Sequence, residues 1–152
     1  MADLVIVAAN VAAGSGAQKD TAANAGATIT AGQLVYKDSS NLWQLSDSNG
    51  AAAAKTITGV SLHASLNGQP LAVQTAGPIT IGATVAVGAI YGLSATAGGI
   101  GVLGNVGGAD GISDLVTGMT TCILGVATST TVIEIRINRM SNVQQKLAEL
   151  LA

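Results

Sequence analysis

The clearest structural signal in the sequence is the stretch Ile79-Thr-Ile-Gly-Ala-Thr-Val-Ala-Val-Gly-Ala-Ile-Tyr-Gly-Leu-Ser-Ala-Thr-Ala-Gly-Gly-Ile-Gly-Val-Leu103. Its apolar residues alternate with small or polar ones at a period of two, which is the pattern of β-strands. The glycines that recur between them favour turns. A membrane-spanning helix needs about 20 mostly apolar residues, but Gly, Thr and Ser interrupt this stretch throughout. It therefore predicts several short strands and no transmembrane helix.

Similar strand-like segments, separated by turn residues, occur on both sides of this stretch. The predicted strands are Asp3–Ala9, Ala27–Tyr36, Leu42–Leu45, Thr56–Ala64, Leu71–Thr75, Ile79–Ile81, Thr84–Val87, Ala89–Ser94, Thr120–Ala127 and Val132–Asn138. Turn residues at Lys37–Asn41 predict a hairpin over Leu34–Leu45, and the last two segments predict another. Many short strands with frequent turns predict one all-β domain over residues 1–140, a small β-sandwich or β-barrel-like fold.

Two segments without an apolar period are predicted as loops. Residues 12–26 are rich in Gly, Ala, Ser and Asn and predict a flexible arm. Residues 104–118 predict a second loop.

A weak internal repeat runs through the β region. Ala31-Gly-Gln-Leu-Val-Tyr-Lys-Asp-Ser39 aligns with Val87-Gly-Ala-Ile-Tyr-Gly-Leu-Ser94 if one gap is allowed, and Gly59-Val60 is echoed by Gly125-Val126. A true repeat predicts two similar β motifs packed face to face. Chance recurrence in a chain rich in Gly, Val and Ala is the other interpretation.

The end of the chain has a different pattern. Ser141-Asn-Val-Gln144 has the form of a helix capping box. The apolar residues of the segment fall on one face of a helix over residues 141–152: Val143, Leu147, Leu150 and Leu151. So short a helix is not stable alone, so we expect this face to dock, either on the chain's own sheet or on a partner chain.

The chain carries little charge. Charged residues make up 9% of it, against about 25% in an ordinary domain, and none lies between Thr56 and Ala109. That surface is either covered by neighbouring subunits or a neutral, hydroxyl-rich soluble surface. Aromatic residues make up 2%, so the core is expected to consist of Val, Ile, Leu and Ala. The net charge of −2 argues against a nucleic-acid partner, because phosphate binding needs clustered Lys and Arg.

The sequence contains no complete motif for catalysis, cofactor binding or metal binding, so we expect no enzyme and no cofactor. Cys122 is the only cysteine, and its apolar surroundings predict a small buried residue. His63 is the only histidine and has no acidic or Cys partner in its strand. Gly99–Gly104 has the letters of a dinucleotide fingerprint without a following helix. Asp110 and Asp114 lack the spacing of a calcium loop.

The β region resembles the small capsid decoration (cement) proteins of tailed bacteriophages, over roughly residues 3–137. The segments that carry the resemblance are Ala27-Thr-Ile-Thr-Ala-Gly-Gln-Leu-Val-Tyr-Lys-Asp-Ser-Ser40, Trp43-Gln-Leu-Ser-Asp47, Gly59-Val60, Gly68-Gln-Pro-Leu-Ala-Val-Gln-Thr75, Ile79-Thr-Ile-Gly-Ala-Thr-Val85, Tyr91-Gly-Leu-Ser-Ala-Thr-Ala-Gly-Gly-Ile100 and Leu124-Gly-Val-Ala-Thr128. The resemblance implies an all-β subunit, a homotrimer rather than a homodimer, that binds the major capsid protein on the outside of the head and reinforces the shell. The helix predicted over residues 141–152 is not part of this pattern.

Two other classes of function remain open. One is a tail or baseplate-associated β module of a virion. The other is a secreted adhesive or carbohydrate-binding β domain, which would normally have exposed aromatic residues and a signal peptide. Asp3 replaces the positive region of a signal peptide and the apolar run Leu4–Ala9 is short, so we expect synthesis in the host cytoplasm. The resemblance to decoration proteins implies a final place on the exterior of the virion capsid.

Overall fold

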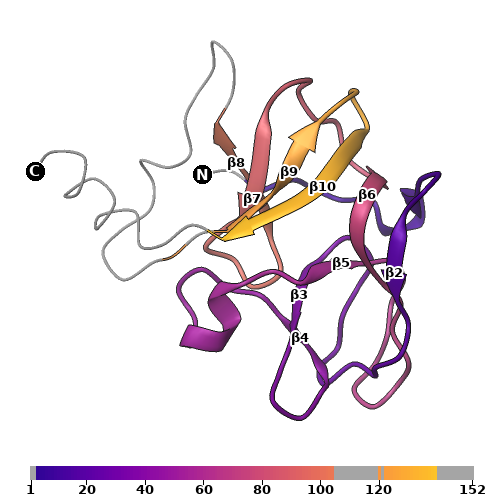
Figure 1. The fold of residues 1–152 in the computed structure, drawn as a ribbon, viewed down its shortest axis with the longest axis vertical. Coiled ribbons are helices and arrows are strands. Elements are labelled where there is room, and N and C mark those ends of the chain that lie inside the picture. Colours follow the sequence, from indigo (N-terminus) through magenta and orange to yellow (C-terminus); the bar gives the residue numbers. More distant parts are fainter. Residues whose placement is uncertain (1–2, 105–119, 121, 140–152) are drawn as a thin grey trace, which may run out of the picture.

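The structure, a computed structural model, describes residues 3–104, 120 and 122–139. These residues form one antiparallel ten-stranded sheet that curls into a half-barrel (Figure 1). The strands are β1 (Val11–Ala13), β2 (Gln18–Asp20), β3 (Leu34–Lys37), β4 (Trp43–Leu45), β5 (Gly59–Ser61), β6 (Val73–Ile81), β7 (Ile90–Leu93), β8 (Ile100–Gly104), β9 (Cys122–Ala127) and β10 (Val132–Arg139). Two 3₁₀ helices accompany them, η1 (Ala8–Asn10) and η2 (Ala52–Lys55). The all-β prediction is confirmed.

The strands follow the order β4-β3-β5-β6-β10-β9-β7-β8, and β1 and β2 pair with β6 outside this path. Both predicted hairpins are present, because β3 pairs with β4 and β9 pairs with β10. The predicted helix over residues 141–152, with Val143, Leu147, Leu150 and Leu151, lies outside the described residues. So does the predicted loop 104–118, apart from Gly104, which ends β8.

Strand β6 differs from the sequence prediction, which divided it into Leu71–Thr75 and Ile79–Ile81. It is a single strand that passes through Gly77 and Pro78. Gly77 has a φ of 92°, a left-handed value that only glycine adopts without strain. The part of β6 before Gly77 pairs with β5 and β2, and the part from Gly77 onwards pairs with β10 and β1. The glycine therefore lies where the strand changes partners.

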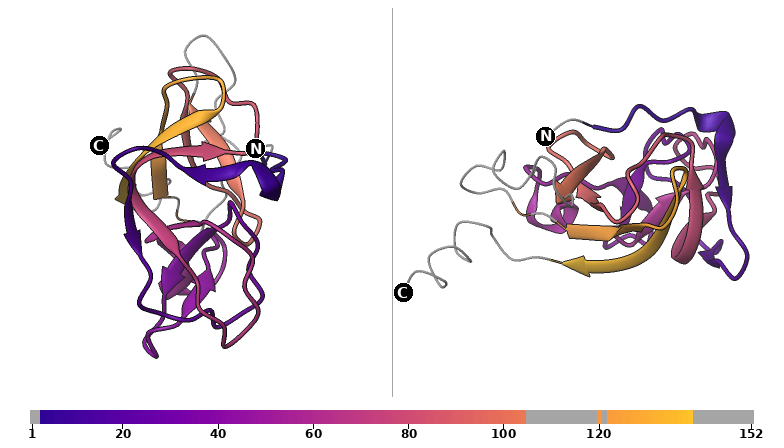
Figure 2. Two further views of the ribbon diagram at one scale, coloured as in Figure 1. Left: turned by 90° about the vertical axis from the view of Figure 1, so that its right-hand side faces the viewer. Right: turned by 90° about the horizontal axis from the view of Figure 1, so that it is seen from above.

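The predicted flexible arm over residues 12–26 is wrong in this structure. Strands β1 and β2 of this segment pair with β6, and Ala23 and Ala25 are buried beyond them. Small residues allow this close approach, since a side chain on Gly14 would collide with Pro78. Figure 2 shows the segment, in indigo, running along the opposite side of the molecule from β10 in its right-hand view.

Two more predicted strands are wrong. In Asp3–Ala9, only Asp3 forms an isolated bridge, to Gly101, and the segment ends in η1. Thr84–Val87 contains no strand. It lies between Gly82 and Gly88, whose φ values of 75° and 83° turn the chain, so this segment has no neighbouring strand with which to form a ladder.

The core is divided into two clusters. The larger lies inside the curled sheet and combines residues of most strands: Leu34, Ile57, Val60, Ile79, Ile81, Val85, Ala89, Tyr91, Leu93, Ile100, Cys122, Leu124, Ala127, Ile133 and Ile135. The smaller surrounds Trp43 and contains Ala23, Ala25, Ile29, Val35, Leu71 and Val73. Aliphatic side chains dominate both, as the scarcity of aromatic residues predicts, and Cys122 is buried, as predicted.

The internal repeat is present in the pairing of the strands. The order β4-β3-β5-β6 in the first half matches β8-β7-β9-β10 in the second. Val35 lies opposite Gly59 in the first half, and Tyr91 lies opposite Gly125 in the second. Tyr91 is therefore the structural counterpart of Val35 and not of Tyr36. The gap that the alignment of residues 31–39 with 87–94 allowed is wrong.

Backbone hydrogen bonds repeat in the same register. The matching pairs are Gly32 N–H to Ser61 O with Gly88 N–H to Ala127 O, Ser61 N–H to Gln33 O with Ala127 N–H to Ala89 O, and Leu62 N–H to Ala72 O with Thr128 N–H to Val132 O. Gly32 and Gly88 also share a left-handed φ, of 84° and 83°. The two halves are joined edge to edge through β6 and β10, and the curl of the sheet brings residues of both into the larger core.

Candidate interaction surface

The side chains with catalytic potential are held in structural roles. The His63 ring bridges two backbone groups: Nδ1 lies 2.9 Å from the Ala64 carbonyl oxygen, and Nε2 accepts a hydrogen bond of 3.0 Å from the Ala72 N–H. Gly99–Gly104 contains strand β8, which ends at Gly104. Asp110 and Asp114 lie outside the described residues.

Among the described residues, no group of three or more His, Cys, Asp or Glu side chains is placed to hold a metal ion.

An open groove lies beside the N-terminal segment. Its volume is about 610 Å³, and its lining carries no charge: Val5, Val7, Asn10, Thr80, Gly82, Ala83, Thr84 and Thr131. The Val5 side chain is 88% exposed and that of Val7 is 53% exposed. Transfer of a valine side chain out of water is worth about 1.5–3 kcal/mol, so these two side chains favour contact with another surface.

The valines are exposed because the segment runs extended along the sheet with its alternate residues facing inward. Leu4 and Ile6 pack against the larger core. The backbone is fixed at both ends, by a Leu4 N–H bond to Ile100 O and a Val7 N–H bond to Gly82 O, each 2.8 Å. Val5 and Val7 are therefore presented on an anchored backbone.

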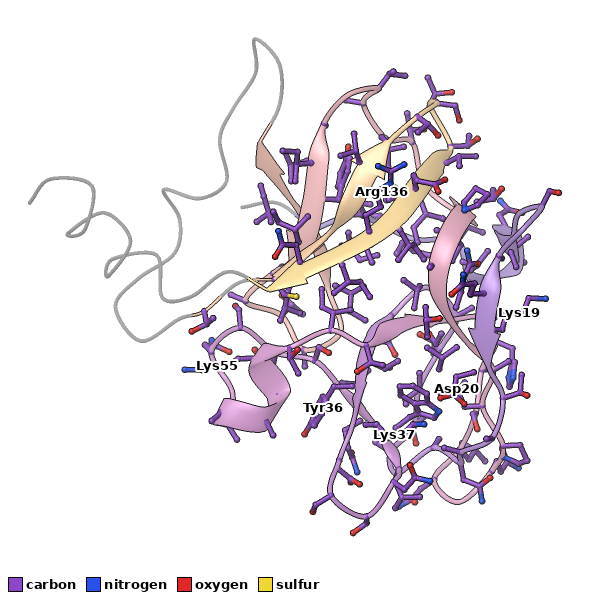
Figure 3. All side chains as sticks on the ribbon, in the orientation of Figure 1. Lys19, Asp20, Tyr36, Lys37, Lys55 and Arg136 are labelled. Carbon is purple, nitrogen blue, oxygen red and sulfur yellow. The ribbon has the colours of Figure 1, made fainter. Side chains whose placement is uncertain are left out.

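The exposed valines adjoin the uncharged part of the chain. The run without charged residues, 56–109, includes strands β5 to β8 and the 82–89 connection, where Val87 is 60% exposed. Of the charged residues labelled in Figure 3, Lys19, Asp20 and Lys37 lie around β2 and β3, Lys55 ends η2, and Arg136 lies on β10.

Asp20 and Lys37 form an ion pair that ties β2 to β3. The Lys37 Nζ lies 2.7 Å from an Asp20 carboxylate oxygen and 4.8 Å from the centre of the Trp43 ring. The hydrogen bond from Lys37 lowers the pKa of Asp20 below its ordinary value. A second carboxylate, Asp38, has its pKa lowered by hydrogen bonds from Gln44 and the Leu42 N–H. Both groups stabilise local structure.

The sequence did not single out Val5 and Val7, although a signal for them exists. Leu4 to Val7 are four apolar residues in succession. An extended segment with one buried face buries only every second side chain, so such a run predicts that some of these apolar side chains are exposed. The residues predicted to dock on a partner, Val143, Leu147, Leu150 and Leu151, lie outside the described part of the chain.

Comparison with known proteins finds no matching family model, no matching curated protein and no matching solved structure. Within the described residues, no helix has the length and apolar character needed to cross a membrane.

Proposed function

We propose that this chain is a non-enzymatic structural protein that binds the outer surface of a bacteriophage head and stabilises the shell. The observation that carries the proposal is the uncharged groove beside Val5 and Val7, two exposed valines on an anchored backbone. The sequence resemblance to capsid decoration proteins supplies the partner, the major capsid protein, and the expected homotrimer.

Weak apolar contacts suit such a role. Burying two valines and their uncharged surroundings provides only a few kcal/mol, at about 1.5–3 kcal/mol for each side chain, before the cost of association. A shell presents many identical sites, and a trimer that engages several of them at once gains affinity through multivalency. No catalytic step is needed.

Co-sedimentation with expanded empty heads tests the proposal. We expect the wild-type protein to sediment with the heads, and the double variant Val5→Asp, Val7→Asp to bind about tenfold or more weakly, because charged groups resist burial. Leu66→Asp is the matched control, since Leu66 is 58% exposed and does not line the groove.

Two outcomes would count against the proposal in different ways. If saturating wild-type protein stays in the supernatant, the chain is not a head decoration protein. If the double variant binds like the control, the groove is not the contact face. Mass spectrometry of separated heads and tails would identify a tail or baseplate module, because the chain would then be found with the tails.

A further inference from the structure

The outer face of the second half of the sheet carries apolar side chains on two strands, β7 and β9, and polar side chains on the adjacent strand β10. Ile90 of β7, Val126 of β9 and Glu134 of β10 are paired in register, so their side chains share this face. Ile123 pairs with Asn138 and joins the same face. Val126 is 37% exposed, and Ile90 and Ile123 are half-buried.

The neighbouring positions on these strands face the opposite way. Tyr91, Leu124, Ile133 and Ile135 are buried in the larger core. Glu134 is half-buried and Arg136 is exposed, and as residues two apart on β10 they lie on the same face of the strand. This outer face, defined by Ile90, Ile123 and Val126 with Glu134 and Arg136 at its border, is called the β9 face.

The first half of the sheet has no such open face. The counterparts of Ile90, Val126 and Glu134 by strand register are Leu34, Val60 and Gln74, and all three are 0% exposed. The reverse face of that half is also covered, because Ala23, Ala25 and Ile29 pack around Trp43. Among the described residues, the first half is therefore covered on both faces and the second half on only one.

We propose that residues 141–152 of the same chain cover the β9 face. A helix over these residues is about 18 Å long at ~1.5 Å per residue, enough to cross the three strands, which are spaced at about 4.8 Å. Its apolar positions, Val143, Leu147, Leu150 and Leu151, match the apolar character of the face.

The position of the chain favours the same molecule as the occupant. Strand β10 ends at Arg139, which pairs with Cys122 at one end of the β9 face, and the amphipathic segment follows almost at once. Its charges complement the border of the face, since Lys146 and Glu149 have signs opposite to Glu134 and Arg136. The inference does not rest on capsid binding and is tested on the isolated protein.

Disulfide trapping tests the contact. We expect Val126→Cys combined with Leu147→Cys to cross-link within one chain on mild oxidation, seen as a compact monomer band on a non-reducing gel and as an intact mass lowered by two hydrogens. The control pair is Val126→Cys with Gln145→Cys, in which the second cysteine is on the polar side of the predicted helix. It should cross-link at least fivefold more slowly. Cys122 stays in place, because it is buried, and Val126→Cys alone reports any bond to it.

The alternative results are distinct. A dimeric cross-linked band would show that the segment covers a second copy, and would overturn the proposal. Equal cross-linking of both pairs, or of neither, would show that the helix face does not meet the β9 face.

An independent measurement uses unfolding. Leu147→Asp should lower the midpoint of urea unfolding while the sedimentation coefficient stays unchanged, and Gln145→Asp should leave both unchanged. If Leu147→Asp instead dissociates an oligomer without moving the midpoint measured on the monomer, the segment docks on a partner and the proposal is wrong.

Discussion

At the residue scale, a few polar contacts hold the segment over residues 12–26 in place. The Lys37 ammonium group bonds to the Asp20 carboxylate across β2 and β3 and lies over the Trp43 ring. An exposed ion pair of this kind contributes only about 0.2–1 kcal/mol. The pair is important because of its position. It joins β3, in the first half of the sheet, to the segment over residues 12–26, which covers β6 and the smaller core.

The lowered pKa of Asp20 predicts an acid dependence. Above the ordinary value of 3.8, the carboxylate is ionised in both the folded and the unfolded chain, and the full contribution of the pair is present. As the pH falls below that value, the unfolded chain takes up the proton first, so the free energy of unfolding decreases. The contribution is lost once the pH has passed the lowered pKa of the folded state.

We expect Asp20→Asn to reduce the free energy of unfolding by about 0.2–1 kcal/mol at pH 7, and the deficit to shrink as the pH falls through the acid range. Urea unfolding at a series of pH values measures this, with a double-mutant cycle through Lys37→Gln as the control. A coupling energy that does not change with pH would contradict the assigned pair.

Residue-scale predictions from sequence succeed where the surroundings are local. The burial of Cys122 follows from the apolar residues beside it in the chain. The exposure of Val5 does not, because an extended segment has two faces and only the fold decides which one is covered. The His63 ring accepts a hydrogen bond from the Ala72 N–H. This contact depends on how the strands pair, and no sequence pattern predicts it.

At the element scale, the repeat explains why a glycine lies at matching positions of β5 and β9. A side chain on Gly59 would collide with the Gln74 carbonyl oxygen, and one on Gly125 would collide with the carbonyl oxygen of Glu134, the counterpart of Gln74. The same close approach of two strands therefore occurs once in each half.

Substitution at either glycine should destabilise the protein. We expect Gly59→Ala and Gly125→Ala each to lower the free energy of unfolding by about 1–3 kcal/mol, because the added methyl group overpacks the strand contact. Gly68→Ala is the control for backbone strain alone, at about 1 kcal/mol, since no atom lies within 4 Å of its added carbon. Equal urea midpoints for Gly125→Ala and the wild type would contradict the strand contact.

Elements set by local turn chemistry were predictable, and elements set by distant pairing were not. The β3–β4 and β9–β10 hairpins follow from turn residues between short apolar runs. Strands β1 and β2 exist because β6, far along the chain, offers them an edge. The Gly77-Pro78 pair interrupts the sequence pattern, but β6 continues through it because both parts of the strand pair with other strands.

At the scale of the whole molecule, two surfaces differ from the rest. The groove beside Val5 and Val7 is lined by uncharged residues, and we propose it as the contact with the capsid shell. For the β9 face we propose residues 141–152 of the same chain as the occupant. The absence of charge between Thr56 and Ala109 left two interpretations open, a covered surface or a neutral, hydroxyl-rich one. It did not locate the groove, because the groove combines residues 5–10 with residues 80–84 and 131.

The thermal stability of the shell tests the central claim most directly. Expanded empty heads are heated in a calorimeter with and without saturating protein, and with the double variant Val5→Asp, Val7→Asp. The proposed function is binding to the intact shell and not to its separated subunits, so linkage predicts a higher melting temperature with the wild type and a much smaller increase with the variant. An unchanged melting temperature at saturating wild-type protein would contradict the proposed function.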